Sequence, residues 1–486
     1  MSILLLQPPV HDFYASPKRM APLALLALFR TLGQTGRSVR VHDLFRAKGK
    51  PLPLPAAFAY LAPFLQPDES PFSFFHRFKR FGRHSDALKV PVHESTSCVA
   101  ITSLSPCYAG QAKDLAQTVK KQRPDLPVVV GGPGPSLAPD LYLTCPAIDQ
   151  VVQGDNVEAI SDLLASPGST RLAQAGSSTT WRLVHSWLAG KRRFPLSLVV
   201  SRGCPRACSF CAVPATSGSR HRVCSLSECE DLFAGLPGKR LWVNFEDDNL
   251  SVNRPFFFAL LKRIIHYGGK DRFNITFMNG LDYRDLDTDS LQLLHRAGLR
   301  VLNLTLGVVP APGGHDPLRR GLDLDRLSAV IRTAGDLGIG VTVYWICGIP
   351  GVTLEQEKNT LAFLCNQPVR IGFSPFYSLP GTSAGLSHSR VSALLWRGSA
   401  CYAHNTELTT CHTVTFFKLA RLLNFVKFAP EKSLLDYGAA IRRMVREKRF
   451  HCLTQGTWRP YPSNKELFSS ALPGILRCLR GRGFAD

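Results

Sequence analysis

The strongest constraint on the fold is a series of six short apolar segments in the middle of the chain. They cover residues 196–201, 240–245, 273–278, 300–306, 340–346 and 369–374. Each of the first five is followed by a stretch with helical spacing of its apolar residues. Short apolar strands that alternate with helices predict a parallel sheet. Six β/α units in a row predict a partial parallel barrel, open because an eight-unit barrel needs two more.

A second alternating series occupies the first 165 residues. Its apolar segments are 3–6, 38–44, 97–104, 127–132 and 149–155, with helical patterns at 22–36, at about 110–122 and from Asn156 onward. This order predicts a doubly wound, Rossmann-like sheet. Residues 46–95 interrupt the pattern and are rich in Pro, Phe and basic residues. A gap of this length predicts either a lid or a segment that packs against a later domain.

The α/β chain is too long for one ordinary core, with 486 residues, and therefore divides into parts. We expect a Rossmann-like domain at 1–165, a linker at 166–194 and a partial barrel at 195–385. Residues 386–486 form a basic region with a mostly helical pattern.

Basic residues exceed acidic ones, and the formal net charge is +22. Residues 381–486 contribute +10 of this, from 16 Lys and Arg against 6 Asp and Glu. This excess indicates either a solvated basic face or a surface for nucleic acid, anionic lipid or an acidic substrate. No apolar run reaches the roughly 18 residues of a membrane span. The N-terminal "MSILLLQPPV" is too short and too quickly broken by Pro for a signal peptide, so we expect a strand there and a cytoplasmic protein.

Three cysteines follow the first barrel strand, at Cys204, Cys208 and Cys211. In parallel α/β barrels, chemistry lies on the loops at the carboxyl ends of the strands. A structural zinc site needs four ligands, and the sequence has no second C-x-x-C. A [4Fe–4S] cluster can be held by three thiolates, which leaves one iron free to bind a small molecule. The triplet therefore predicts an iron–sulfur reaction centre.

The other eleven cysteines do not show a paired or metal-binding spacing. The "CSLSEC" segment (224–229) and the Cys and His residues at 401–412 match no metal pattern. We expect these thiols to be reduced and buried or incidental.

The cysteine triplet, with Phe210 just before its last member, resembles the radical S-adenosylmethionine (SAM) superfamily. Over residues 1–385 the chain resembles the class with a cobalamin-binding domain, in "ILLLQPP", "VVVGGPGPSLAP", "VVQGDNVEAI", "RGCPRACSFC", "FEDDNLSVN", "GIPG" and "LPGT". The resemblance implies an enzyme in which the three cysteines hold a [4Fe–4S] cluster and SAM binds the open iron. An electron would cleave SAM to methionine and a 5′-deoxyadenosyl radical, for hydrogen abstraction or, with cobalamin, methyl transfer. It also implies an electron donor such as flavodoxin or ferredoxin. Because no known RNA-binding module is visible in the sequence, we expect a small-molecule substrate.

The same resemblance assigns further residues to the site. SAM would be contacted by Phe210, Glu246, Asp247, Asp248, Gly348, Pro350 and Gly351. A cobalamin pocket would include Gly131, Gly132 and Gly154. From their place on loops after barrel strands, we expect Asn279, Arg284 and Tyr377 to line a substrate pocket. Simpler interpretations stay open: a tight turn after a strand for the glycines, a turn with a helix cap for 246–249, salt bridges or turns for Asn279 and Arg284, and packing for Tyr377.

Two departures from the family pattern limit these assignments. The family often has a Glu after the glycine of the fourth strand, where this chain has Val308 and Val309 after Gly307. The cobalt-ligand motif D-x-H-x-x-G is absent, because His11 and His42 do not lie in it. The departures leave a domain without cobalamin and a non-catalytic iron–sulfur protein as alternatives. The basic C-terminal region adds a third, an RNA-modifying relative in which this region holds RNA.

Overall fold

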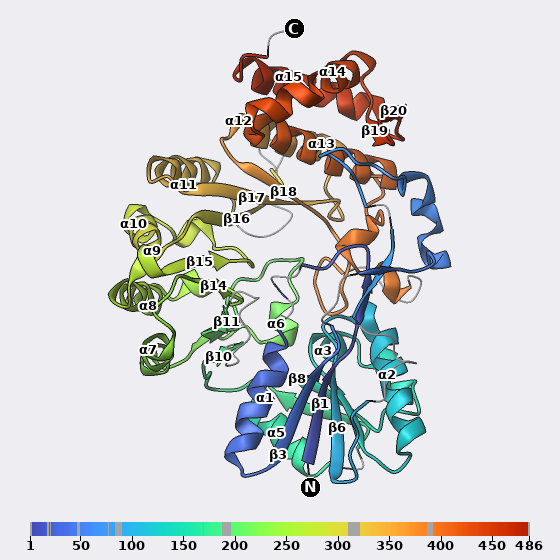
Figure 1. The fold of residues 1–486 in the computed structure, drawn as a ribbon, viewed down its shortest axis with the longest axis vertical. Coiled ribbons are helices and arrows are strands. Elements are labelled where there is room, and N and C mark those ends of the chain that lie inside the picture. Colours follow the sequence, from blue (N-terminus) through green and yellow to red (C-terminus); the bar gives the residue numbers. More distant parts are fainter. Residues whose placement is uncertain are drawn as a thin grey trace.

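The computed structural model of the chain describes residues 2–16, 19, 21–45, 49–75, 77–82, 90–168, 170–186, 196–309, 321–385 and 392–484. Residues 187–194 of the predicted linker lie outside this set. Figure 1 shows three parts along the long axis: an N-terminal sheet at the bottom, a fan of strands in the middle and C-terminal helices at the top.

A six-stranded parallel sheet forms the N-terminal part. In spatial order its strands are β3 (Ser38–Asp43), β1 (Ser2–Gln7), β6 (Thr96–Thr102), β7 (Val128–Gly131), β8 (Gln150–Gly154) and β9 (Leu172–Gly176). The first five lie at the predicted positions. The strand order changes direction between β1 and β6, which makes the carboxyl edge there a natural place for a ligand crevice.

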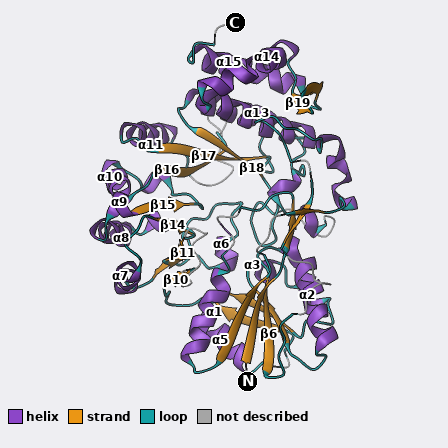
Figure 2. Cartoon of the chain, viewed as in Figure 1, coloured by secondary structure: helices purple, strands orange, loops and turns teal. Residues whose placement is uncertain are grey.

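Both faces of this sheet are covered by helices, as Figure 2 also shows. On one face, Ile3 and Leu5 pack with residues of α1 (Leu23–Gln34) and α5 (Val157–Ala165). On the other face, Leu4 and Leu6 pack with residues of α2 (Ala109–Gln122) and α4 (Asp140–Leu143). Successive strand residues point to opposite faces, so a strand that is covered on both faces has apolar residues at successive positions in the sequence.

The six predicted barrel strands are all present and parallel. They are β11 (Leu196–Val199), β14 (Leu241–Phe245), β15 (Phe273–Phe277), β16 (Val301–Gly307), β17 (Gly340–Cys347) and β18 (Arg370–Pro375). Two isolated parallel bridges, Ile275 to Leu299 and Leu281 to Leu304, join the β11–β15 group to the β16–β18 group. The predicted α/β class with a partial barrel is confirmed.

Five helices form the outer layer of the barrel; the first four in chain order lie on the left of Figure 1, and the last lies beside the C-terminal helices. They are α7 (Leu226–Gly235), α8 (Arg254–His266), α10 (Thr288–Ala297), α11 (Leu324–Asp336) and α12 (Leu354–Asn366). The sequence explains where they begin, since Ser225, Asn253, Asp287, Asp323 and Thr353 each cap an N-terminus with a side-chain oxygen.

The stretch expected as a linker contains two strands that the sequence analysis did not predict. Strand β9 extends the N-terminal sheet, and β10 (Val184–His185) pairs antiparallel with β11 at the edge of the barrel. The two domains are thus connected by a segment that belongs to both sheets.

The C-terminal region is mostly helical, as expected. Its helices are α13 (Thr410–Phe428), α14 (Glu431–Glu447) and α15 (Lys465–Arg480), with a hairpin of β19 (His451–Thr454) and β20 (Thr457–Pro460).

Residues 49–75 pack against this C-terminal region, which is one of the two outcomes expected for the 46–95 segment (Figure 1). Lys418 and Asp68 form a fully buried ion pair of 2.8 Å. The Tyr461 hydroxyl donates to the Phe64 carbonyl oxygen at 2.7 Å, and Phe72 stacks on Trp458.

Candidate active site at the mouth of the barrel

The cysteine triplet lies in the loop after the first barrel strand. Beyond β11 the chain forms the short strand β12 (Ser201–Arg202), which pairs with β13 (Arg222–Val223), and then turns at Gly203 with φ at +83°. A Cβ at Gly203 would lie 2.2 Å from the Arg220 carbonyl oxygen, so this turn requires glycine.

The three thiols of this loop suit an iron–sulfur cluster. Cys204 is buried, Cys208 and Cys211 are half-buried, and none of the three is part of a disulfide. Burial raises the pKa of the Cys211 thiol to about 11, and the Cys208 and Cys204 thiols add to the rise, so the three side chains interact. Within the described ranges, no three Cys, His, Asp or Glu side chains converge on one metal ion. Cluster ligation does not need such convergence, because the thiolates are spread over several irons.

Asp247, the second of the three carboxylates after β14, is held through one oxygen by the segment that leads to the cysteines, and its Oδ2 has no hydrogen-bond partner in the described part of the chain. Its Oδ1 accepts hydrogen bonds from the Val200 N–H at 3.0 Å, the Ser201 N–H at 2.5 Å and the Ser201 hydroxyl at 2.7 Å. Burial raises the pKa of Asp247 to about 7. The side chain therefore fixes the bend between β11 and β12.

Asp248 holds the next part of the same loop. Its Oδ2 accepts from the Gly203 N–H at 2.8 Å, and its Oδ1 pairs with the Arg202 guanidinium at 3.1 Å. A carboxylate that accepts from a backbone amide and an arginine is strongly held.

Glu246 differs from these two because its partners are side chains from both domains. Arg19, from the loop before α1, reaches Glu246 Oε2 with its Nη2 at 2.7 Å and Asn279 Oδ1 at 2.5 Å. Asn244 donates to Glu246 Oε1 at 2.6 Å. The Glu246 side chain is 12% exposed and the Arg19 side chain 41% exposed, so the pair faces the barrel mouth.

Phe210 packs into a small apolar cluster formed by the ends of β16, β17 and β18. The cluster contains Val308, Ile349, Val352 and Phe376. The cluster gives a reason why the chain has valine after Gly307, where the family often has glutamate. Val308 is completely buried there, and a carboxylate at this position would lose its solvation.

The "GIPG" loop (348–351) is fixed from two sides by residues that the sequence analysis missed. Glu357 accepts from the Gly348 N–H at 2.7 Å and from the Trp345 indole N–H at 2.6 Å. Asn405, from the segment before α13, donates to the carbonyl oxygens of Ile349 at 2.7 Å and Val352 at 2.6 Å.

A cavity of about 240 Å³ opens at the carboxyl edge of the N-terminal sheet, on its α1 and α5 face. Gly131, Gly132 and Gly154 all line it, together with Arg202 and Asp248 from the barrel side. A Cβ at Gly131 would meet nothing closer than 3.8 Å, so the missing side chain there leaves room in the cavity. The Thr102 hydroxyl lines the same cavity and has no hydrogen-bond partner in the described part of the chain.

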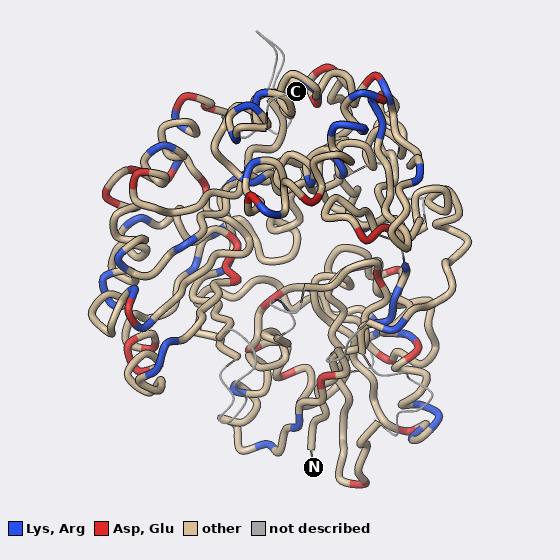
Figure 3. Tube along the Cα trace, turned by 45° about the horizontal axis from the view of Figure 1, so that its top comes forward, with Lys and Arg blue, Asp and Glu red and all other residues tan. Residues whose placement is uncertain are grey.

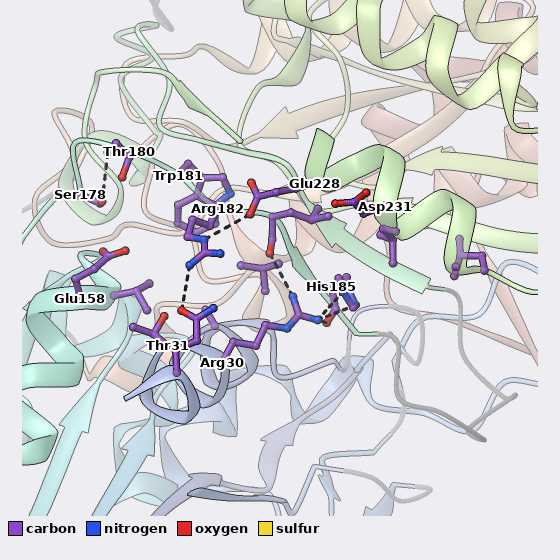
Figure 4. A pocket seen from close by; sticks show the side chains of 18 residues that line it. Arg30, Thr31, Glu158, Ser178, Thr180, Trp181, Arg182, His185, Glu228 and Asp231 are labelled. Atoms are coloured by element: carbon purple, nitrogen blue, oxygen red, sulfur yellow. Dashed lines mark hydrogen bonds and ion pairs between the residues drawn. The ribbon is translucent and has the colours of Figure 1, made fainter. Parts of the chain in front are cut away.

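A second pocket, of about 490 Å³, lies on the outer side of Trp181, between α1, α5 and α7 (Figure 4). Ala27, Val157, Trp181 and Val184 line both this pocket and the cavity. Its charged groups are largely engaged with one another, since Arg30 contacts His185 and Arg182 pairs with Glu228.

Residues 198–364 match the radical SAM superfamily, and residues 86–164 match the B12 binding domain. The chain is a radical SAM enzyme of the cobalamin-binding-domain class. A [4Fe–4S] cluster and SAM are therefore among its cofactors, and the B12 binding domain extends over β7 and β8, which line the cavity. Like other enzymes of its superfamily, it needs a reductant and a substrate. No described helix is long and apolar enough to cross a bilayer.

Solved structures of two enzymes of this class share the fold. The radical SAM methyltransferase TsrM from Kitasatospora setae, with tryptophan substrate and a SAM analogue bound, superimposes with a TM-score of 0.59 at 16% identity and covers 99% of both chains. The cobalamin-dependent SAM radical enzyme OxsB, with aqua-cobalamin and SAM bound, has a TM-score of 0.50 at 11% identity, over 96% of this chain and 65% of its own.

Among curated proteins, the chain is 25% identical over 333 residues to tRNA-2-methylthio-N(6)-dimethylallyladenosine synthase of Mycobacterium bovis (strain ATCC BAA-935 / AF2122/97). The match covers 63% of this chain and 62% of the relative, so the chain spans less than two thirds of that protein.

In this radical SAM enzyme, the three residues expected to contact substrate have different surroundings. Arg284 is locked onto Asp282 by two hydrogen bonds, at 2.9 and 2.5 Å. Asn279 contacts Arg19 and donates to the Asp247 carbonyl oxygen at 2.9 Å. Tyr377 follows β18 and is 40% exposed.

Proposed function

We propose that this radical SAM enzyme uses Cys204, Cys208 and Cys211 to hold its cluster and the cavity at Gly131 to hold cobalamin, and that it transfers a methyl group to a small molecule. When bound, the cluster with SAM supplies a 5′-deoxyadenosyl radical, and cobalamin supplies methyl transfer. The electron donor would be a protein of the flavodoxin or ferredoxin class.

One observation carries the proposal: the cavity at Gly131 and the cysteine loop are in contact with the same two side chains. Arg202 and Asp248 both line the cavity, and Asp248 also binds the Gly203 N–H immediately before Cys204. Two cofactor sites that share an ion pair can exchange a group without release to solvent. The glycine-lined cavity with an unpartnered hydroxyl from Thr102 supports a ligand with polar groups at this edge.

The protein's own groups would position the two cofactors. Asp247 and Asp248 would fix the cysteine loop, and Glu246 would offer a carboxylate to the SAM ammonium at the mouth, with Arg19 close to it. Phe210 would pack between the cluster loop and the "GIPG" loop, where SAM's adenosyl part is expected. Tyr377 and Asn279 would border the substrate.

The test uses full-length protein reconstituted anaerobically with iron and sulfide and supplied with hydroxocobalamin, SAM and dithionite. Wild-type protein should form 5′-deoxyadenosine, or methylcobalamin together with S-adenosylhomocysteine. A variant with Cys204→Ala, Cys208→Ala and Cys211→Ala should form none of these and should lack the cluster absorption. A full cluster in the triple variant would overturn the assignment of the cysteines. A full wild-type cluster with neither product would favour the non-catalytic alternative.

A second candidate is modification of RNA, because the matched relative from Mycobacterium bovis is named for action on tRNA. The observation that favours it is a set of exposed basic residues in α14 and at its C-terminal cap, Lys432, Arg442, Arg446 and Lys448. Figure 3 shows how Lys and Arg positions are distributed along the backbone. Other basic residues of the region serve the fold, since Lys418 is buried and Lys427 donates to the Leu364 carbonyl oxygen.

Removal of the C-terminal region would expose residues 49–75, so point substitutions are the better test of this candidate. Arg442→Gln, Arg446→Gln and Lys448→Gln together should weaken RNA binding and flatten its salt dependence if α14 holds RNA. If the variant binds RNA as weakly as wild-type protein and with the same salt dependence, modification of RNA is excluded as the function.

A further inference from the structure

Asn249, in the loop that follows β14, contacts one of the cysteines. Its Nδ2 lies 3.5 Å from Cys204 Sγ, a normal length for a hydrogen bond to the large sulfur atom. Asn249 is 7% exposed and Cys204 is 8% exposed. The contact is therefore shielded from water, which would otherwise compete for the sulfur.

Ser251 fixes which end of the Asn249 amide faces the sulfur. Its hydroxyl lies 3.1 Å from Asn249 Oδ1 and 3.1 Å from Asp285 Oδ2. A hydroxyl has one hydrogen, which these two acceptors share. An iron-bound thiolate only accepts hydrogen bonds, so the NH₂ end of the amide has to point at Cys204.

Arg206 closes the series of contacts back onto the cysteine loop. It lies between Cys204 and Cys208, and its Nη2 donates to Asp285 Oδ1 at 2.7 Å. Its Nε also lies 3.4 Å from Asp282 Oδ2. An ion pair therefore ties the cysteine loop to the segment that follows β15, and the sulfur contact ties it to the segment that follows β14.

We propose that Cys204, Asn249, Ser251, Asp285 and Arg206, here called the Asn249 ring, position the cluster loop and set the reduction potential of the cluster. The proposal depends on the role of Cys204 given under Proposed function. Asn249 and Ser251 are positioning residues, since they act through Cys204.

The physical reason lies in the charge of the reduced cluster. An N–H group that donates to a ligating sulfur stabilises the extra negative charge, and hydrogen bonds to the sulfurs are among the factors that set cluster potentials. Removal of the Asn249 donor should make the cluster harder to reduce, and so shift its midpoint potential to a more negative value. A merely structural asparagine would change stability and leave the potential as it was.

The experiment is a redox titration of reconstituted full-length protein, followed by electron paramagnetic resonance of the reduced cluster. Asn249→Leu should keep the iron content and show a more negative midpoint potential. Ser251→Ala should shift the potential in the same direction by a smaller amount, and Ser251→Thr, which keeps the hydroxyl, should restore the wild-type value. Asn274→Leu is the matched control, because Asn274 lies on β15 and takes no part in the ring, and it should not shift the potential.

An Asn249→Leu variant with a full cluster and the wild-type potential would overturn the proposal. If Asn249→Leu does not retain the cluster, the Ser251→Ala and Ser251→Thr pair decides, and equal potentials in the two would overturn it. Failure of the cysteine assignment would look different, as an intact cluster in the Cys204→Ala, Cys208→Ala, Cys211→Ala variant.

Discussion

Asp248 accepts a 2.8 Å hydrogen bond from the backbone N–H of Gly203, one residue before the first cysteine of the triplet. The carboxylate therefore belongs to the framework of the cluster loop. The resemblance to the family had suggested that Asp248 contacts the SAM ammonium. A role in supporting the cysteine loop and a role in binding SAM predict different effects of its substitution.

Asp248→Ala should loosen the cluster loop. A hydrogen bond to a charged group contributes about 1.5–3 kcal/mol, which corresponds to roughly 10- to 150-fold in an equilibrium. We expect iron to be lost to a chelator faster by a factor in this range. The measurement is iron release from reconstituted protein over time, with Asp336→Ala, an exposed carboxylate of α11, as the control. If Asp248→Ala released iron at the wild-type rate but bound SAM more weakly, Asp248 would instead be a SAM-binding residue.

Asp247 should make the protein less stable as the pH rises. Burial raises its pKa from 3.8 to about 7, so the folded state holds a proton that the unfolded state releases. The resulting stabilisation is complete below about pH 3.8 and is lost as the pH rises through about 7. Glu357, whose pKa is also raised to about 7 by burial, acts in the same direction. Thermal unfolding between pH 5 and 8 should show a falling midpoint in wild-type protein and a smaller fall in Asp247→Asn. An identical slope in the two proteins would contradict the prediction.

Glu357→Gln should weaken SAM binding while the cluster stays intact. Both carboxylate oxygens accept from N–H groups, so a glutamine NH₂ would face either the Gly348 amide or the Trp345 indole. One buried donor would then lack its partner, at a cost of about 1–3 kcal/mol, and the "GIPG" loop should loosen. We expect SAM affinity to fall by about tenfold or more, measured by SAM titration of 5′-deoxyadenosine formation. Glu355→Gln, the same substitution at an exposed position of the same helix, should bind SAM as wild type does.

The strands and helices could be predicted from the sequence because their signals are local. The runs around Leu4 and Val129 are apolar on both faces, and caps such as Asp287 mark where helices begin. The cysteine triplet was equally clear, since three thiols within eight residues restrict the chemistry by themselves. Strand β9 was missed because "LAQAG" carries little apolar signal and sits at the sheet edge.

The partners of the site residues could not be predicted, because they are distant in sequence. Arg19 meets Glu246 across 227 positions, and Asn405 meets Ile349 across 56. No periodicity or spacing encodes such contacts; they arise from how the domains pack. The same applies to Val308, whose burial among Ile349 and Phe376 is visible only in the folded chain.

Gly131→Leu should abolish cobalamin binding without harm to the fold. Gly131 lines the cavity and a Cβ there would meet nothing within 3.8 Å, so a leucine would occupy the space of the ligand. The neighbouring Gly132 cannot serve this purpose, because its φ is +106° and a Cβ would lie 2.9 Å from the Ser103 carbonyl oxygen. The measurement is a hydroxocobalamin titration, with Gly110→Leu on α2 as the control, since open space surrounds that position. Wild-type affinity in Gly131→Leu would place cobalamin elsewhere, and no binding to wild-type protein would indicate a domain without the cofactor.

Lys418→Met should separate the C-terminal region from residues 49–75. The Lys418 ammonium lies 2.8 Å from Asp68 Oδ2, with side chains 0% and 1% exposed, and 4.0 Å from the centre of the Tyr461 ring. Asp68 also accepts from the Leu453 N–H at 3.1 Å, so loss of the lysine leaves this buried carboxylate without its ion-pair partner. Removal of one partner of a buried ion pair costs about 3–5 kcal/mol. Urea unfolding should show this loss in Lys418→Met and a partial recovery in the double variant with Asp68→Asn, which carries no buried charge. If the single variant were as stable as wild type, this ion pair would not hold the two segments together, and truncation of the C-terminal region would become a usable test of RNA binding after all.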